Sequence, residues 1–244
     1  MKRLTLAILA ATFCFGQATP QFDVVSIRPS ASDDRNGGMR PIAGGFSARN
    51  MSVNALIQLA YNLKPWQIVG GPGWVTTDRY DIEAKKEGNP GVDEKLEMFR
   101  PLLADRFQLQ FHRETRQAPI YSLIIAKNGP RLQTAAAGAR GYIRSGRGLV
   151  EGKGMSMRIF ADLLGGSLGQ PVVDKTGISG GFDITFRWTP AEGEANYRDA
   201  DRPLDPNAPS IFTAIQEQLG LKLEAEKGPL EVLVIDHIER PSPN

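Results

Sequence analysis

Cysteine and histidine are almost absent from this chain. Its 244 residues include one cysteine, Cys14, and two histidines, His112 and His237. A single thiol cannot form an intrachain disulfide, and two distant histidines lack the spacing of a chelating pair. The glycine-rich stretch "GGPGW" at 70–74 lacks the lysine of a phosphate loop. The sequence therefore predicts no disulfide framework, no thiolate chemistry, no metal site and no bound cofactor.

An excess of charge of either sign is also lacking. The formal net charge of +2 comes from Lys2 and Arg3, and without them 27 basic residues face 27 acidic ones. A nearly neutral protein has no electrostatic footprint for nucleic acid or for an anionic membrane surface. We expect neither of them as a partner.

The main apolar run of the chain stands at its start. A basic start precedes this run at 4–15, and the small residues of "GQATP" then permit cleavage after Ala18. A run this short with these flanks is typical of a secretory signal peptide and not of a membrane span. We expect residues 1–18 to be removed and the mature protein, without a membrane span, to be periplasmic or extracellular. Lipidation of Cys14 is the open alternative, although Phe13 is a poor residue to precede a lipidated cysteine.

Pairs of similar segments occur in the same order in the two halves of the chain. The pairs are "NMSVNALIQLAYN" (50–62) with "GMSMRIFADLLGG" (154–166), "RYDIEAK" (79–85) with "GFDITFRW" (181–188), "MFRPLLADRFQLQF" (98–111) with "IFTAIQEQLGLKLEA" (211–225), and "APIYSLIIA" (118–126) with "GPLEVLVID" (228–236). Such a constant order indicates an internal duplication. We expect two tandem repeats of about a hundred residues each: the first at 19–133 with an extra N-terminal strand, a linker at 134–148, and the second at 149–244.

Both halves have the same predicted element order, β-α-β-β-α-β-β, which makes the fold class α+β. The first helix of each half has apolar residues at i, i+3, i+4 and i+7, and Ser52 or Ser156 stands at its N-cap position. Each half is expected to close with a hairpin of two alternating strands. These hairpins are "FQLQFHRE" (107–114) with "PIYSLIIAK" (119–127), and "LKLEAEK" (221–227) with "LEVLVIDHIE" (230–239).

Glycine and proline mark the expected helix ends. Gly165 and Gly166 are predicted to terminate a helix over 156–165, and Gly220 to terminate the last helix in a left-handed conformation. Pro101 falls inside a predicted helix, where it removes a backbone donor. That helix must therefore start late or kink.

Several segments carry a family resemblance. "SIRPS", "FSARNMSV", "VVDKTGISGGFDITFRW" and "IFTAIQEQLGLKLEAEKGPLEVLVIDHIERPSPN" resemble a secreted, soil-associated family of acidobacteria that is defined as a domain of unknown function. The resemblance covers nearly all of the mature chain. It implies a bacterial envelope protein, in some members fused to BlaR-type membrane sensor peptidases, and it brings no catalytic residues. In element order each half also resembles the short N-terminal domain of secretins and TonB-dependent receptors, a small interaction module.

The stretch "GGSLG" at 165–169 matches the G-x-S-x-G pattern of a hydrolase nucleophile elbow. An elbow requires a strand before Ser167 and a helix after it, whereas the predicted order here is the reverse. Asp174, Asp183 or Asp205 could complete a triad with His237, but His237 falls in a predicted strand whose pattern already accounts for it. We therefore expect no catalytic residues.

Trp66 and Trp74 flank a short predicted strand and are candidate contacts for a partner, since tryptophan is enriched at interface hot spots. They could equally cover the core. The favoured hypothesis is a non-enzymatic binding or interaction module of the cell envelope, whose partner, an envelope protein or peptide, docks on an exposed sheet edge. The alternative is a secreted hydrolase with a site between the two repeats, in which Ser167 is an improbable nucleophile.

Overall fold

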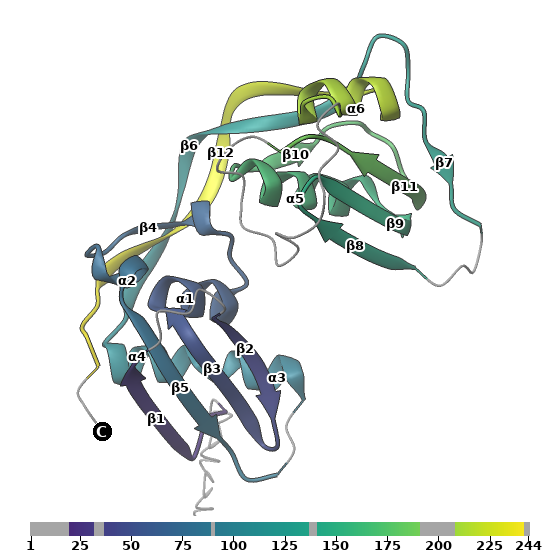
Figure 1. Cartoon of the computed structure of the whole chain (residues 1–244). Helices are drawn as coiled ribbons and strands as arrows, with labels where there is room; N and C mark the ends of the chain where they lie inside the picture. Colours follow the sequence, from purple (N-terminus) through teal and green to yellow (C-terminus); the bar gives the residue numbers. More distant parts are fainter. Residues whose placement is uncertain (1–19, 32–36, 89–90, 137–140, 191–207, 242–244) are drawn as a thin grey trace, which may run out of the picture. The chain divides into compact units, whose positions relative to one another are not determined.

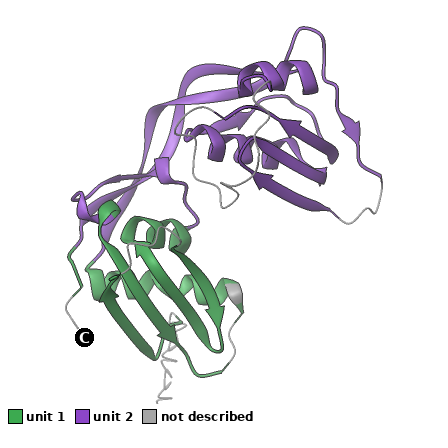
Figure 2. Ribbon diagram, viewed as in Figure 1, with its two compact units in different colours: residues 1–61, 76–108, 239–244 green, residues 62–75, 109–238 purple. Residues whose placement is uncertain are grey.

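The computed structural model describes residues 20–31, 37–88, 91–136, 141–190 and 208–241. The fold is α+β, with several small sheets and short helices (Figure 1). Two compact units are formed, one from the described part of residues 1–61, 76–108 and 239–244 and the other from residues 62–75 and 109–238 (Figure 2). The predicted signal peptide and Cys14 lie outside the described residues.

The first unit is built on a four-stranded antiparallel sheet in the order β1-β5-β3-β2. Its strands are β1 (Val24–Pro29), β2 (Gly38–Ile42), β3 (Gly45–Ser52) and β5 (Arg79–Lys85). Its helices are α1 (Val53–Tyr61), α3 (Val92–Glu97) and α4 (Phe99–Phe107). The strand predicted over residues 22–30 is β1, and it forms one edge of this sheet.

Local signals explain where these helices start. The hydroxyl of Ser52 accepts the amide hydrogen of Ala55 at 3.2 Å, which confirms the predicted cap at the start of α1. Pro101 lies in the first turn of α4, and Met98 separates this helix from α3. The late start is one of the two predicted solutions, because a first turn needs no amide donor from proline.

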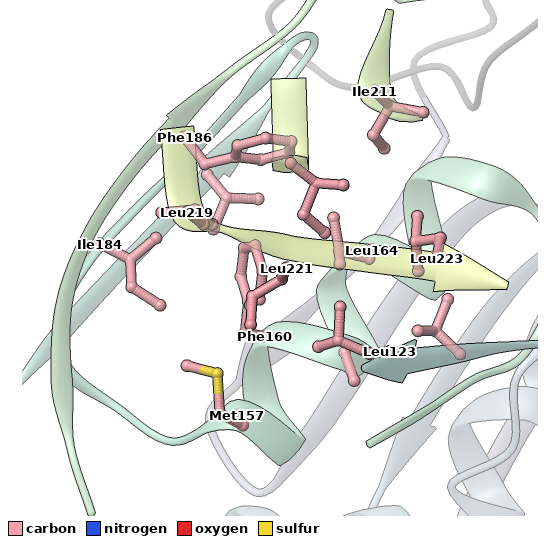
Figure 3. Packing of buried hydrophobic residues seen from close by; sticks show 14 of the residues in the cluster. Leu123, Met157, Phe160, Leu164, Ile184, Phe186, Ile211, Leu219, Leu221 and Leu223 are labelled. Carbon is pink, nitrogen blue, oxygen red and sulfur yellow. The ribbon is translucent and has the colours of Figure 1, made fainter. Parts of the chain in front are cut away.

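The second unit contains another four-stranded antiparallel sheet, in the order β7-β11-β9-β8. Its strands are β7 (Gln133–Thr134), β8 (Tyr142–Gly146), β9 (Leu149–Met155) and β11 (Phe182–Arg187), and the helices of the unit are α5 (Met157–Leu168) and α6 (Ile211–Leu219). Side chains from both helices and from the strands form one apolar cluster. Figure 3 shows Phe160 and Leu164 of α5 among its members, together with Leu221.

The caps of these two helices follow the sequence. The hydroxyl of Ser156 accepts the amide hydrogen of Ile159 at 3.3 Å. Gly220 ends α6 with a φ of 63°, and its amide donates to the carbonyl oxygen of Gln216 at 3.1 Å. Both the serine N-cap and the left-handed glycine are confirmed.

Two long strands, β6 (Gln110–Ile125) and β12 (Leu221–His237), pair antiparallel along nearly their whole length. Two short strands extend this ribbon into a sheet of order β10-β6-β12-β4. β10 (Val172–Asp174) runs parallel to β6, and β4 (Ile68–Gly70) runs parallel to β12. The 3-10 turn η1 (Pro65–Gln67) precedes β4, and the short helix α2 (Trp74–Thr77) follows it.

The two closing hairpins expected from the sequence are wrong. Each is one continuous strand, and the two strands pair with each other, with Ala118 opposite Gly228 near the middle. Pro119 and Pro229 lie inside these strands, and proline is tolerated in a strand where no neighbour needs its amide hydrogen. In the middle of the ribbon each strand has a described neighbour on one side only, because β10 and β4 pair with other parts of β6 and β12.

A bulge occurs in a similar place in both antiparallel sheets. Asn50 in β3 has a φ of 49°, and its amide donates to Oδ1 of Asp81 at 2.9 Å. Gly154 in β9 has a φ of 66°, and its amide donates to Oδ1 of Asp183 at 3.2 Å. A bulge removes a backbone amide from the strand ladder, so each aspartate satisfies a donor that would otherwise lose its partner.

Candidate functional site

Ser167 lies in the last turn of α5 and is 2% exposed. Its hydroxyl donates to the carbonyl oxygen of Leu163 at 3.4 Å, one helical turn back. A helix precedes this serine and β10 follows it, which is the reverse of a nucleophile elbow. The pattern "GGSLG" therefore forms no elbow here.

The end of this helix differs from the prediction. α5 continues to Leu168 and ends at Gly169, whose φ is 65°, so Gly165 and Gly166 are helical. A Cβ atom added at Gly165 would be 3.4 Å from a ring carbon of Trp66 and 3.0 Å from the carbonyl oxygen of Gln170. The absence of a side chain at Gly165 thus leaves room for the indole, which a pattern of helix-ending glycines does not reveal.

The two predicted contact residues are both half-buried. Trp66 belongs to η1, and its ring lies against Gly165 of α5. Trp74 is the first residue of α2. Their binding of a partner stays a prediction, although Trp66 already uses part of its ring in packing.

The remaining polar candidates make local contacts. Nδ1 of His112 lies 2.8 Å from Oδ1 of Asp236 on the neighbouring strand. Asp174 accepts hydrogen bonds from the amide and the hydroxyl of Thr176, at 3.0 and 2.7 Å, which is a turn contact. Asp205 falls outside the described residues. Within those residues no group of three or more His, Cys, Asp or Glu side chains is arranged to hold a metal ion.

The long-strand pairing assembles one polar cluster that the sequence does not indicate. The hydroxyl of Ser122 donates to Oε1 of Glu226 at 2.6 Å, and the ammonium of Lys175 lies 2.5 Å from the same oxygen. Hydrogen bonds from Lys175 and then from Ser122 hold the pKa of the Glu226 carboxyl below its usual value. A carboxylate with a lowered pKa is a weaker general base, and Ser122 is only 3% exposed, which favours a structural role for this cluster.

Glu226→Gln should make stability less dependent on pH in the acid range. A carboxyl whose pKa is lowered by folding stabilises the protein above its unfolded pKa, and this contribution is lost as the pH falls through the folded pKa. The difference in unfolding free energy between the two proteins should therefore be largest near neutral pH and shrink below about pH 4.3. Urea denaturation across this range measures it. A difference in unfolding free energy that stays constant with pH would show that folding does not lower the pKa of the Glu226 carboxyl.

A pocket of about 340 Å³ lies in the first unit between the start of the chain's first strand and α4; we call it the β1–α4 pocket. Its apolar lining comes from Phe22 and Val25 on the strand side and from Met98, Pro101 and Leu102 on the helix side. Its polar lining is Gln21, Asp23, Asp105 and Arg106. The volume is at the lower end of the range of ligand pockets, about 300–1,000 Å³.

The strand beside this pocket is an open edge. β5 is the only strand that pairs with β1 within the described part of the chain. Ser30 donates its amide hydrogen to the carbonyl oxygen of Arg79 at 2.8 Å, and backbone groups alternate in direction along an antiparallel strand. Val25 and Ile27 therefore direct their amide and carbonyl groups away from β5. The side chain of Val25 lines the pocket, so the edge and the pocket adjoin.

The fold and this geometry define an α+β protein with an open strand edge beside a partly apolar pocket. The chain belongs to the family described as protein of unknown function (DUF3738), which matches residues 54–238. No curated protein and no solved structure gives a significant match. No helix among the described residues is long and apolar enough to cross a membrane.

Proposed function

We propose that this protein is a non-enzymatic binding module of the bacterial cell envelope that binds an extended peptide at β1. The observation that carries the proposal is the open edge of β1 directly beside the β1–α4 pocket. An added strand is held by main-chain hydrogen bonds, and pockets for alternate side chains provide its specificity.

In this proposal the backbone of β1 and the side chains of the β1–α4 pocket have different roles in binding the peptide. The outward amide and carbonyl groups of Val25 and Ile27 hydrogen-bond to the added strand. One side chain of the peptide enters the pocket, where Leu102 and Met98 form a buried apolar wall, 5% and 0% exposed. An apolar side chain gains most there, at roughly 25 cal/mol per Å² of apolar surface removed from water.

Two expectations from the sequence belong to this proposal. The basic start and apolar run before Ala18 favour export, and the family resemblance favours a secreted protein of acidobacteria in soil. We further propose that the chain arose by duplication, with repeats at 19–133 and 149–244. The corresponding strand orders, β1-β5-β3-β2 and β7-β11-β9-β8, and the bulges at Asn50 and Gly154 support a duplication, although β7 and β8 precede residue 149. The element order behind the likeness to the interaction domain of secretins and TonB-dependent receptors included two closing hairpins, in place of which β6 and β12 are single long strands.

Val25→Pro is expected to abolish peptide binding at this edge while the protein stays folded. The substitution removes an outward amide hydrogen that an added strand would use, and it breaks no hydrogen bond between β1 and β5. Peptides selected from a random display library against the chain from Thr19 onward provide the probes, and biolayer interferometry measures their affinity.

Val24→Ala is the matched control, because this side chain is 64% exposed on the opposite face of β1. It should leave the affinity unchanged. Selected peptides that bind Val25→Pro as tightly as the parent chain would exclude β1 as the binding edge.

A further inference from the structure

The edges of the two antiparallel sheets differ in their protection. In the first unit the edge strand β2 contains Pro41. Ile42 and Gly45 are paired across a two-residue turn, so the backbone groups of Ile42 point toward β3. Those of the preceding residue, Pro41, therefore point away from β3, toward the open side of the strand. A proline there has no amide hydrogen to offer to a further strand, which is a common protection of sheet edges.

The corresponding edge of the second unit lacks this protection. Gly146 of β8 pairs with Leu149 across a two-residue turn, so Ser145 occupies the position that Pro41 has in β2. The backbone groups of Ser145 and Ile143 therefore point away from β9, toward the open side of β8. Within the described residues β9 is the only strand that pairs with β8.

Two of the exposed side chains on this edge are large and hydrophobic. Tyr142 is 45% exposed and Ile143 is 48% exposed, although they point to opposite faces of the sheet. Ile143 is opposite Gly152 of β9, which has no side chain to cover it. An open edge with exposed apolar side chains is a template for a further strand.

We propose that β8 pairs antiparallel with β8 of a second copy of this chain, centred on Ile143, so that the sheet continues from one copy into the other. The pairing is isologous, because the same strand contributes from both copies. Ile143 lies opposite Ile143, and Gly141 lies opposite Ser145. All of these residues have outward backbone groups, so the hydrogen bonds across the junction are complete.

Charge selects this register. It places Tyr142 opposite Arg144 of the other copy, and the hydroxyl of Tyr142 donates to Oε1 of Glu151 at 3.0 Å. The guanidinium of Arg144 thus lies near the ring of Tyr142 and the carboxylate of Glu151 in the other copy. A register centred one residue further on would place Arg144 opposite Arg144, and like charges directly opposite each other destabilise a strand pair.

Engineered cysteines test the register. The single natural cysteine, Cys14, belongs to the predicted signal peptide, so a chain from Thr19 onward has none. Opposed residues of a hydrogen-bonded pair have Cα atoms about 5.5 Å apart, within the range of a disulfide. After mild oxidation, Ile143→Cys should migrate as a covalent dimer on a non-reducing gel, whereas Arg144→Cys should remain monomeric. Equal cross-linking of both variants, or of neither, would overturn the proposal.

Sedimentation velocity tests the edge itself. The parent chain should dimerise by about 100 µM, and Ser145→Pro should weaken dimerisation about tenfold or more because each copy loses an amide donor. Pro41 in the same position of β2 shows that such a strand accommodates proline. Ser145→Ala is the control that should keep the dimer.

If circular dichroism shows that Ser145→Pro is unfolded, Ile143→Lys takes its place, because it sets two charges against each other at the centre of the junction. A parent chain that stays monomeric would overturn the proposal and leave β8 to a different partner. A dimer that neither substitution weakens would also overturn it. The test involves the second unit only, so its result is separable from peptide binding at β1.

Discussion

Phe160→Ala is expected to lower the free energy of unfolding by about 3–5 kcal/mol, the usual cost of emptying a buried aromatic site. Phe160 is 0% exposed, and its ring centroid lies 5.7 Å from that of Phe186 in an edge-to-face arrangement at 86°. Such a ring pair adds to the burial term, and the truncation removes both. Urea denaturation followed by circular dichroism measures the change as a lower midpoint.

Ile159→Ala is the matched control, because Ile159 is the preceding residue of α5 and is 36% exposed. It should cost clearly less than Phe160→Ala. Equal losses from the two substitutions would mean that the cluster in Figure 3 does not dominate the stability of the second unit.

Gly220→Ala is expected to cost more than the loss of a left-handed helix end alone. A left-handed conformation costs a non-glycine residue about 1–2 kcal/mol. At Gly220 an added Cβ atom would in addition lie 2.0 Å from the carbonyl oxygen of Gly129, so the turn that contains Gly129 must move. That turn is held by hydrogen bonds, among them one from the amide of Arg131 to the carbonyl oxygen of Leu219 at 2.8 Å.

Gly169→Ala separates the two contributions. Gly169 also ends a helix in the left-handed conformation, with a φ of 65°, but no atom lies within 4 Å of its added Cβ. The free energy of unfolding of this variant should therefore fall only by the conformational cost, about 1–2 kcal/mol, and that of Gly220→Ala should fall by more. Thermal or urea unfolding of both variants compares them directly. Equal losses of unfolding free energy in the two variants would show that the turn containing Gly129 moves at no cost in free energy.

The helices α1, α4, α5 and α6 could be predicted because their signals are local, whereas α2 and α3 were not predicted. Ser52 and Ser156 stand next to the amides that they cap, and the apolar spacing of α1 and α5 repeats within the helix itself. Strand pairing depends on residues far along the chain, which explains the errors at β6 and β12. The strand continues through Ala118 because it pairs with β12, where Gly228 lies opposite, and no local pattern contains that information.

The candidate sites were predictable to a smaller extent. The sequence indicated the strand that became β1, but the pocket beside it requires α4 to lie against residues that precede it by many positions in the chain. It also indicated Trp66 as a candidate contact without revealing that Gly165 receives its ring. The cluster of Ser122, Lys175 and Glu226 arises from strand register, which only the assembled sheet determines.

The central sheet has a consequence for the order of folding. β6 is a strand of 16 residues, yet its neighbours in the sheet, β10 and β12, both come from later in the chain. Among the strands that the structure describes, β4 likewise pairs only with β12. During synthesis from the N-terminus, β6 must therefore wait for β10 and β4 must wait for β12 before either strand gains a neighbour in this sheet. Completion of this sheet thus depends on β12, which joins β6 to β4 although the three strands are far apart in the sequence.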